Sequence, residues 1–185
     1  MLRLRLRKAD RSFNRKKKLK KSTAFIALGS NRGNRINYFK AAIEGIRRDS
    51  KIEIVKSSPV YETKAFGKTD QPNFLNAVVQ LNTSYNLLGL FNCLKNLELE
   101  LGRTAAEKWG RREIDLDLLF FNQEIYSDEK LSVPHYGIQD RDFVLIPLCD
   151  IAPNFVHPVL NQKISDICSD IISKTIIRKT RFKLN

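Results

Sequence analysis

The order of the apolar segments is the feature that most constrains the fold of this chain. Four segments have the length and composition of strands, and two show the spacing of an amphipathic helix. In order, they are 23–28 (strand), 36–46 (helix), 51–58 (strand), 74–81 (strand), 87–101 (helix) and 113–121 (strand). This β-α-β-β-α-β order is typical of an α+β protein, the ferredoxin-like α/β sandwich, with helices on one face of a mostly antiparallel sheet.

The ends of the two helices carry the expected signals. Asn34 can cap the first helix and Gly102 can end the second. A long polar loop is expected at 59–72, and a small C-terminal extension with a helix at 164–172. A chain of 185 residues can build one such domain with a real core.

The positive charge of the chain is concentrated at its beginning. Residues 1–21 hold eleven basic side chains and one acid, Asp10, so only +3 of the net charge of +13 belongs to the rest. This segment has no apolar period, which predicts a disordered basic tail at 1–21 and a single folded domain at 22–185. An organelle transit peptide is the alternative for this tail.

The cellular setting is indicated by what the sequence lacks. No apolar run approaches the about 18 residues that a membrane span needs. Cys93, Cys149 and Cys168 show no CxxC spacing and are expected to be reduced thiols. We therefore expect a cytoplasmic protein without a membrane partner.

Two aspartates stand in an otherwise apolar strand. Asp115 and Asp117 alternate with Leu116, so both carboxylates should point to one face of the sheet. A hard divalent cation such as Mg²⁺ would offset their repulsion, although two surface aspartates on a solvated edge are an equal alternative. Arg111 and Arg112 just upstream suit a polyphosphate bridged by the metal, unless they only pair with the aspartates.

An aromatic and an amide share a face in the preceding strand. Phe74 and Asn76 are two residues apart, which suits a stacked flat heterocycle whose edge is hydrogen-bonded. The alternative is a core phenylalanine with a structural asparagine. The residues themselves leave both interpretations open.

Several motifs in the same order resemble a known family. The segment 109–118, Trp-Gly-Arg-Arg-Glu-Ile-Asp-Leu-Asp-Leu, resembles the signature of the 6-hydroxymethyl-7,8-dihydropterin pyrophosphokinases of folate biosynthesis. Segments 27–31, 70–76, 98–103 and 133–136, with Arg141 and Phe143, resemble further motifs of that family.

The resemblance implies a reaction and a set of site residues. Pyrophosphate would pass from ATP to the hydroxymethyl group of the pterin, with release of AMP, and two Mg²⁺ ions would be bound by Asp115 and Asp117. The catalytic residues would be Asp115, Asp117, Arg103, Arg112 and His135. ATP would be bound by Phe91, Lys95, Glu98, Arg103, Trp109, Arg112, Leu118, Lys130, Ser132, His135, Tyr136 and Arg141. The pterin would be bound by Leu28, Thr63, Phe66, Phe74, Asn76, Asp115 and Phe143, with Phe74 and Phe143 on its two faces.

Two rival functions follow from the same sequence. An RNA-binding domain can share the β-α-β-β-α-β order and the basic tail, but no aromatic-rich RNP-type strand is present and the body is only mildly basic. The other rival is an inactive homologue. Against it stand the intact residues of the motifs, namely Asp115, Asp117, Arg112, Asn76 and His135. We expect a monomer that acts on small molecules and has no specific nucleic-acid partner.

Overall fold

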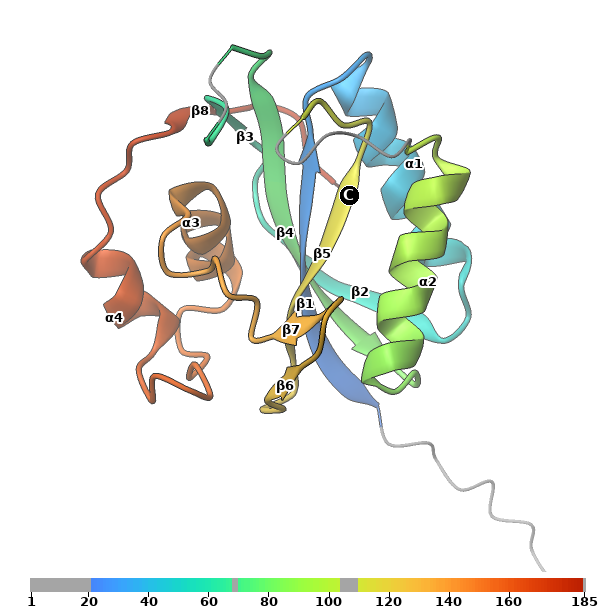
Figure 1. Ribbon diagram of the computed structural model, residues 1–185, viewed down its shortest axis with the longest axis vertical. Coiled ribbons are helices and arrows are strands. Elements are labelled where there is room, and N and C mark those ends of the chain that lie inside the picture. Colours follow the sequence, from blue (N-terminus) through green and yellow to red (C-terminus); the bar gives the residue numbers. More distant parts are fainter. Residues whose placement is uncertain (1–20, 68–69, 104–109, 185) are drawn as a thin grey trace, which may run out of the picture.

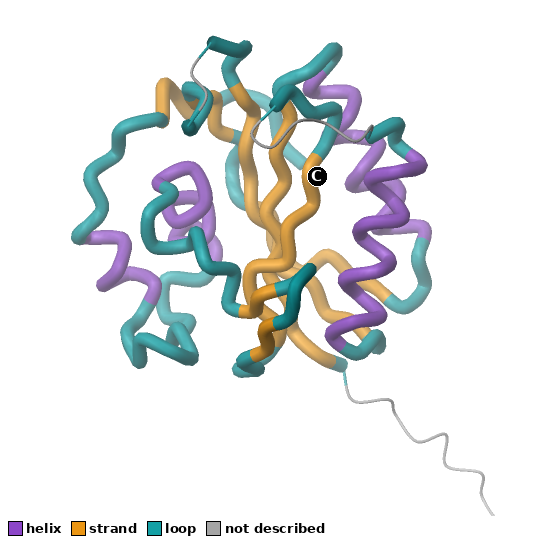
Figure 2. The backbone as a smooth tube through the Cα atoms, viewed as in Figure 1, coloured by secondary structure: helices purple, strands orange, loops and turns teal. Residues whose placement is uncertain are grey.

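The computed structural model describes residues 21–67, 70–103 and 110–184 and has a layered architecture. A central sheet separates α1 and α2 on one side from α3 and α4 on the other (Figures 1 and 2). The elements are β1 (Ser22–Ser30), α1 (Arg35–Arg48), β2 (Ile52–Ser57), β3 (Tyr61–Thr63), β4 (Phe74–Thr83), α2 (Leu87–Glu100), β5 (Asp115–Phe121), β6 (Tyr126–Ser127), β7 (Ser132–Val133), α3 (Asp142–Ile151), α4 (Ile164–Ser169) and β8 (Ile176–Lys179).

The six-stranded sheet is antiparallel and is built around β4. Its order is β5-β1-β4-β3-β8, and β2 also pairs with β4. The two short neighbours divide β4 between them, since β2 pairs with its second half and β3 with residues 74–76. This division lets β3 lie at the end of the sheet where Asp115 begins β5.

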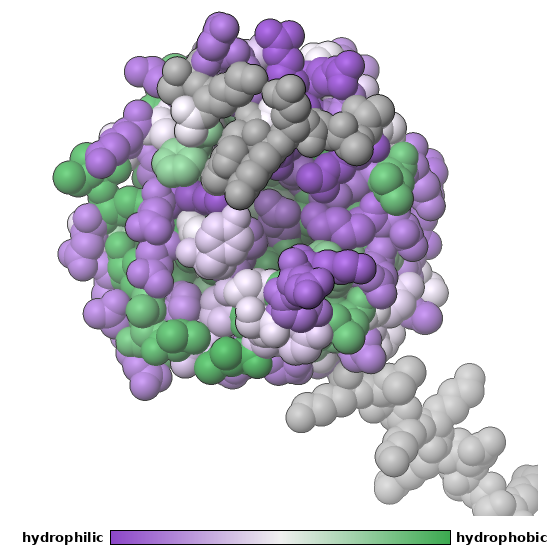
Figure 3. All heavy atoms as spheres, in the orientation of Figure 1, coloured by the Kyte–Doolittle hydropathy of each residue, from purple (hydrophilic) through white to green (hydrophobic). Residues whose placement is uncertain are grey.

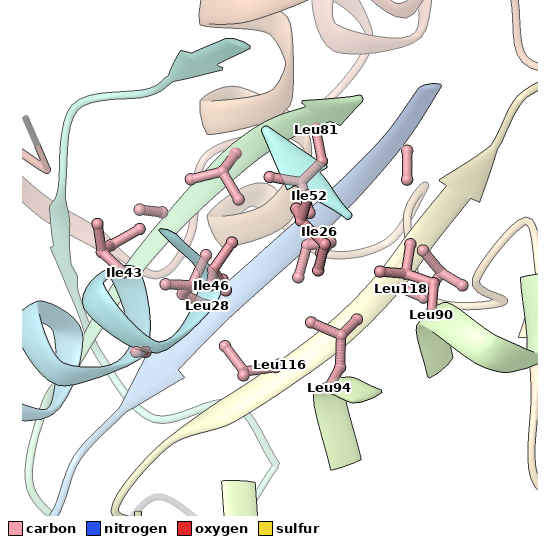
Figure 4. Packing of buried hydrophobic residues seen from close by; sticks show 14 of the residues in the cluster. Ile26, Leu28, Ile43, Ile46, Ile52, Leu81, Leu90, Leu94, Leu116 and Leu118 are labelled. Carbon is pink, nitrogen blue, oxygen red and sulfur yellow. The ribbon is translucent and has the colours of Figure 1, made fainter. Parts of the chain in front are cut away.

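Successive side chains of β1 point to opposite faces of the sheet, so this strand contributes to a hydrophobic core on each side. Ala24, Ile26 and Leu28 belong to the cluster that α1 and α2 cover, whereas Phe25 belongs to the cluster beneath α3 and α4. Figure 4 shows the first cluster, in which side chains of α1 and α2 meet those of the central strands. Because both faces are buried, the central strands are held firmly from both sides.

The helix caps agree with the sequence. Asn34 Oδ1 accepts a hydrogen bond from the backbone N–H of Asn37 at 3.1 Å, which confirms the predicted start of α1. Asn86 caps α2 in the same way through Gly89 N–H at 2.8 Å. Gly102 follows α2 with a positive φ of 87°, a conformation that favours glycine.

Three expectations need correction. Helices cover both faces of the sheet rather than one, because α3 and α4 bury an apolar face of their own against it. The expected loop at 59–72 contains β3, and the expected helix at 164–172 ends at Ser169.

None of the described helices is long and apolar enough for a membrane crossing.

Candidate active site

A cavity of about 240 Å³ opens at one end of the sheet. Strands β1, β3, β4 and β5 form its floor and one wall, and the start of α3 with residues 135–141 forms the other. Figure 3 shows the molecule in the orientation of Figure 1; hydrophilic residues predominate on this face, and hydrophobic ones gather toward its left and lower-left edge. The cavity contains both sets of chemistry that the sequence singles out, the aspartate pair and the aromatic–amide pair.

The floor of the cavity is made of small residues. Ala27 and Gly29 face it from β1, and Gly29 lies between Asn76 of β4 and Asp115 of β5 in the register of the sheet. A Cβ at Gly29 would come within 3.1 Å of Asn76 Oδ1. The missing side chain therefore leaves an open surface between an amide and a carboxylate.

The amide is held in place by its neighbour. Asn76 Nδ2 donates a hydrogen bond to Thr63 Oγ1 at 2.8 Å, and both side chains are buried. This bond sets the orientation of the Asn76 amide. Asn76 Oδ1 is thereby placed on the side of Gly29, where it can accept from a ligand.

Three aromatic rings border the same end of the cavity. Phe66, Phe74 and Phe143 all line it, and the rings of Phe66 and Phe143 lie 5.8 Å apart at 54°. Phe66 is 40% exposed, so part of its ring is available to a bound molecule. Leu28 borders the cavity through its backbone, because its side chain is buried in the opposite core.

The two carboxylates point to one face of β5, as the alternation predicts. Asp115 and Asp117 line the cavity, while Leu116 and Leu118 are buried under α2. Arg112 forms a hydrogen bond with Asp115 Oδ2, and Arg103 Nη2 lies 2.8 Å from Asp115 Oδ1. Of the two arginines just upstream, Arg112 does pair with an aspartate, which was the alternative to a phosphate-binding role.

The environment separates the pKa values of the two aspartates. Burial, followed by the charge of Asp117, raises the pKa of Asp115 to about 6. Burial opposes ionisation of Asp117 as well, but the positive charge of Lys95 and the influence of His135 and the arginines outweigh it and lower its pKa. A pair of carboxylates with one poorly stabilised charge is suited to receiving a cation.

A buried glutamate organises the cations around this pair. Glu98 is 2% exposed and accepts a hydrogen bond from the backbone N–H of Leu116 at 2.6 Å. It also accepts from Lys95 Nζ at 2.8 Å and from Arg103. Lys95 Nζ lies 3.4 Å from Asp117 Oδ1 as well, so Glu98 holds both cations beside the carboxylates.

His135 is fixed by backbone contacts on the other wall. The backbone N–H of His135 donates a hydrogen bond to the Leu119 carbonyl at 3.0 Å, and its ring Nδ1 accepts one from the backbone N–H of Gly137 at 3.1 Å. Burial lowers the pKa of His135 despite the nearby charge of Asp117. An accepting Nδ1 leaves Nε2 to carry the proton of the neutral ring, as a donor.

Tyr136 and Arg141 extend this wall. The Tyr136 ring stacks on His135 at 4.6 Å and 23°, and the Arg141 guanidinium lies 5.4 Å from the centre of the Tyr136 ring. Gly137 makes room for Arg141, because a Cβ there would lie 2.5 Å from Arg141 Nε. Tyr136 is 71% exposed, so its outer face is open to solvent or to a ligand.

Comparison with known proteins identifies the family. The model of the family described as 7,8-dihydro-6-hydroxymethylpterin-pyrophosphokinase (HPPK) matches residues 25–153. The chain belongs to this family. It is similar to the 2-amino-4-hydroxy-6-hydroxymethyldihydropteridine pyrophosphokinases of Haemophilus influenzae (40% identical, covering 74% of this chain and 85% of the relative) and Aquifex aeolicus (41% identical, 78% and 89%). This HPPK chain is therefore an enzyme of the pyrophosphokinase class.

Solved structures support the same fold. Crystal structures of Plasmodium falciparum HPPK-DHPS match with a TM-score of 0.65 at 18% identity, covering 81% of this chain and 43% of that chain. A second structure of that protein matches with a TM-score of 0.64 at 19% identity, covering 83% and 43%. The chain thus spans less than half of the solved chains, and the likeness concerns the fold.

The remaining nucleotide candidates among the described residues do not line the cavity. The Phe91 ring lies 5.8 Å from Lys95 Nζ on α2, Leu118 is 2% exposed in the core, and Lys130 is exposed. Ser132 Oγ in β7 donates to the Pro134 carbonyl at 3.1 Å. Trp109 lies outside the described residues.

Sequence reasoning missed one residue that organises the site. Asn31 is 2% exposed, and its Oδ1 accepts from the backbone N–H of Arg112 at 2.8 Å while its Nδ2 donates to Gln71 Oε1 at 3.0 Å. It therefore joins the segment that carries Arg112 to the loop before β4. The only signal in the sequence was its place in the motif at 27–31.

Proposed function

We propose that this HPPK-family chain transfers the pyrophosphoryl group of ATP to the hydroxymethyl group of 6-hydroxymethyl-7,8-dihydropterin, in folate biosynthesis. The observation that carries the proposal is the single cavity that joins Asp115 and Asp117 to Asn76 across Gly29. The hydroxyl oxygen forms a bond to the β-phosphorus, the bond between that phosphorus and the α-phosphate oxygen breaks, and AMP leaves. The hydroxyl proton is released to solvent or to a base.

Mg²⁺ fits the residues at the carboxylate end. Asp115 Oδ1 is buried, and its ion pair with Arg103 Nη2 at 2.8 Å lacks hydrogen-bond geometry. Asp117 lies on the same face of β5. Two carboxylates are enough for Mg²⁺, since this ion completes its shell with water and phosphate oxygens. Asp115 and Asp117 would hold two such ions, which supply charge neutralisation at the phosphates.

The hydrogen-bond donors around the carboxylates have a binding role in this proposal. Arg103, Arg112 and His135 donate to the triphosphate, where negative charge shifts during transfer. A bound polyphosphate would compete with Asp115 for the two arginines that pair with it in this structure. The other proposed nucleotide contacts are Phe91, Lys95, Trp109, Lys130, Ser132, Tyr136 and Arg141. The buried Glu98 would act through Lys95 and Arg103, and the buried Leu118 through its backbone.

The pterin occupies the amide end of the cavity. Asn76, set by Thr63, hydrogen-bonds the edge of the ring, while Phe74 and Phe143 contact its faces and Phe66 borders it. The backbone near Leu28 completes the edge contacts. Pyrophosphoryl transfer then needs the hydroxymethyl group to point from Asn76 toward Asp115, along the floor that Gly29 leaves open.

Three more general features, the fold class, the cellular compartment and the oligomeric state, complete the proposal. We class the core of four main strands with α1 and α2 as ferredoxin-like, which the order β5-β1-β4-β2 supports. The three cysteines are unpaired, which suits a reducing cytoplasm. The protein acts as a monomer on small molecules and has no specific nucleic-acid partner.

The test is an assay of AMP release from ATP. We expect release to require both Mg²⁺ and the hydroxymethyl-dihydropterin, and Asp117→Ala to lower it about a thousandfold or more through loss of a metal ligand. Turnover that persists in the alanine variant at modest Mg²⁺ would contradict the metal assignment. No release by the wild type, together with salt-resistant RNA binding by the folded body, would favour the RNA-binding alternative.

A further inference from the structure

A buried carboxylate outside the catalytic set ties the C-terminal segment to the cavity wall. Asp142 is 3% exposed and is the first residue of α3. Its Oδ2 accepts hydrogen bonds from the backbone N–H groups of Lys174 and Thr175, both at 2.7 Å. Thr175 Oγ1 donates to Oδ1, and Ser173 Oγ donates to Oδ2 at 3.3 Å.

This carboxylate takes the place of a helix cap. Arg141, the N-cap residue of α3, makes no side-chain capping bond, whereas Asp142 Oδ1 accepts from the N–H of Phe143 at 2.9 Å. The first turn of α3 is therefore fixed through Asp142 and the segment it binds. That turn carries Phe143, which lines the cavity.

The same segment also holds the opposite wall. The Thr175 carbonyl accepts from the N–H of Lys64 at 2.8 Å, directly after β3. Strand β8 then pairs with β3, with Ile176 opposite Thr63. Thr63 is the residue that orients Asn76, so residues 173–176 touch the supports of both walls.

We propose that Asp142 and Thr175 are positioning residues that set the distance between the Phe143 wall and the Thr63–Asn76 wall, and thereby the affinity for the pterin. Residues 173–176 lie beyond the region 25–153 that the family model matches. The inference rests on the proposed function, because it takes the pterin to lie between these walls. Neither Asp142 nor Thr175 needs to touch the substrate.

The experiment compares Asp142→Asn, Thr175→Val and Thr175→Ser with the wild type and with a matched control, Asp150→Asn. Asp150 is also on α3 and also joins it to the sheet, through Tyr61 Oη at 2.6 Å, but it lies near the C-terminal end of the helix, away from the first turn that carries Phe143. Steady-state kinetics gives KM for the pterin, KM for ATP and kcat. Calorimetric titration with a dihydropterin that lacks the hydroxyl group gives its affinity directly, and thermal melting reports the fold.

We expect Asp142→Asn to raise KM for the pterin and weaken the titrated affinity about tenfold, the size expected for a buried group left without its partner. KM for ATP and kcat should stay within about threefold of the wild type. Thr175→Val should show a smaller loss in the same direction, and Thr175→Ser should restore wild-type values because the hydroxyl remains. Asp150→Asn should lower the melting temperature without changing KM for the pterin.

The outcomes separate the two proposals. If the wild type neither binds the pterin nor turns over, the proposed function fails. If the wild type is active and the folded Asp142→Asn variant keeps its pterin affinity, the positioning role is wrong. Should Asp142→Asn fail to fold, Thr175→Val decides, since it leaves the carboxylate and the backbone bonds in place. An equal rise in KM in Asp150→Asn would show a general effect of stability and would also overturn the inference.

Discussion

Single residues decide what the cavity can hold. Ala27 and Gly29 contribute almost no side chain to its floor, while the residues beside Gly29 in the sheet, Asn76 and Asp115, contribute a polar group each. A flat molecule can therefore lie on the backbone and reach an amide at one end and a carboxylate at the other. A larger residue at Gly29 would displace Asn76 before it affected the core, because the nearest atom to an added Cβ is Asn76 Oδ1 at 3.1 Å.

Asp115 should show opposite effects on activity and stability. Its raised pKa, about 6, means that ionisation costs folding free energy as the pH rises from about 4 through 6. We expect Asp115→Asn to lower turnover at least about a hundredfold and yet to raise the melting temperature of the ligand-free protein at pH 7.5. Melting curves from pH 4 to 8 without Mg²⁺ check this, and the advantage of the variant should disappear toward pH 4. A variant less stable than the wild type at every pH would contradict the cause assigned to the shift.

Gly137 should matter through Arg141. An added Cβ would lie 2.5 Å from Arg141 Nε and 2.6 Å from its Cζ, so the flexible guanidinium must move rather than the backbone. We expect Gly137→Ala to raise KM for ATP about three- to tenfold, a typical loss for one charge-assisted contact, with little change in melting temperature. Arg141→Ala in the Gly137→Ala background should add little, since the same contact is already lost. Additive losses would show that Gly137 acts on another group.

The sequence predicts the chemical residues of the site better than their surroundings. Asp115, Asp117 and Asn76 stand out because each is an unfavourable residue in a strand, and Phe74 shares a face with Asn76. All four line one cavity. The small floor could not be predicted from local sequence, since the role of Gly29 depends on which residues the sheet places beside it. The roles of these residues toward substrates stay a prediction.

At the scale of elements, α1 and α2 pack closely at one point. A Cβ on Gly45 of α1 would lie 2.5 Å from Leu97 Cδ1 of α2. We expect Gly45→Val to lower the free energy of unfolding by about 2 kcal/mol through overpacking, in spite of the poor helix propensity of glycine. Urea unfolding measures the change, and Leu97→Ala in the same chain should recover most of it. A stabilised Gly45→Val variant would mean that helix propensity outweighs the contact.

Elements with a clear period are predicted well, and those that depend on distant partners are not. The bounds expected for β1, β4, β5, α1 and α2 agree with the structure to within a few residues. Strand β3 has three residues and exists because β4 and β8 pair with it. Helix α3 is apolar on most sides and contains Pro147, so no helical stripe marks it in the sequence.

The whole molecule has a clear division of charge between its body and the first 21 residues. The tail that is expected to be disordered comprises residues 1–21, of which 1–20 lie outside the described residues. Its last residue, Lys21, makes an exposed ion pair with Glu53 at 2.6 Å. Such a pair contributes little to stability. We propose that 22–185 is one domain and expect deletion of residues 1–21 to leave turnover and melting temperature nearly unchanged.

The deletion removes most of the net positive charge, and this loss should be visible in binding to a polyanion. Retention on a heparin column should fall sharply, because binding to polyanions scales with the number of cations that contact them. Loss of turnover on deletion would show that the domain begins earlier. Tight RNA binding by the shortened body at high salt would reopen the nucleic-acid interpretation.

The two ends of the folded body differ in how well they could be joined to a linker or a fusion partner. Ser22 begins β1, and Gly29 faces the cavity seven residues later, so an attachment before Ser22 lies roughly 20–25 Å along the strand from the reacting groups. At the other end Leu184 is 3% exposed in the core beneath α1, and its carbonyl accepts from Arg47. An immobilised or fused enzyme should therefore stay active when it is linked through residue 21. A linker that replaces Leu184 would remove a buried side chain from this packing.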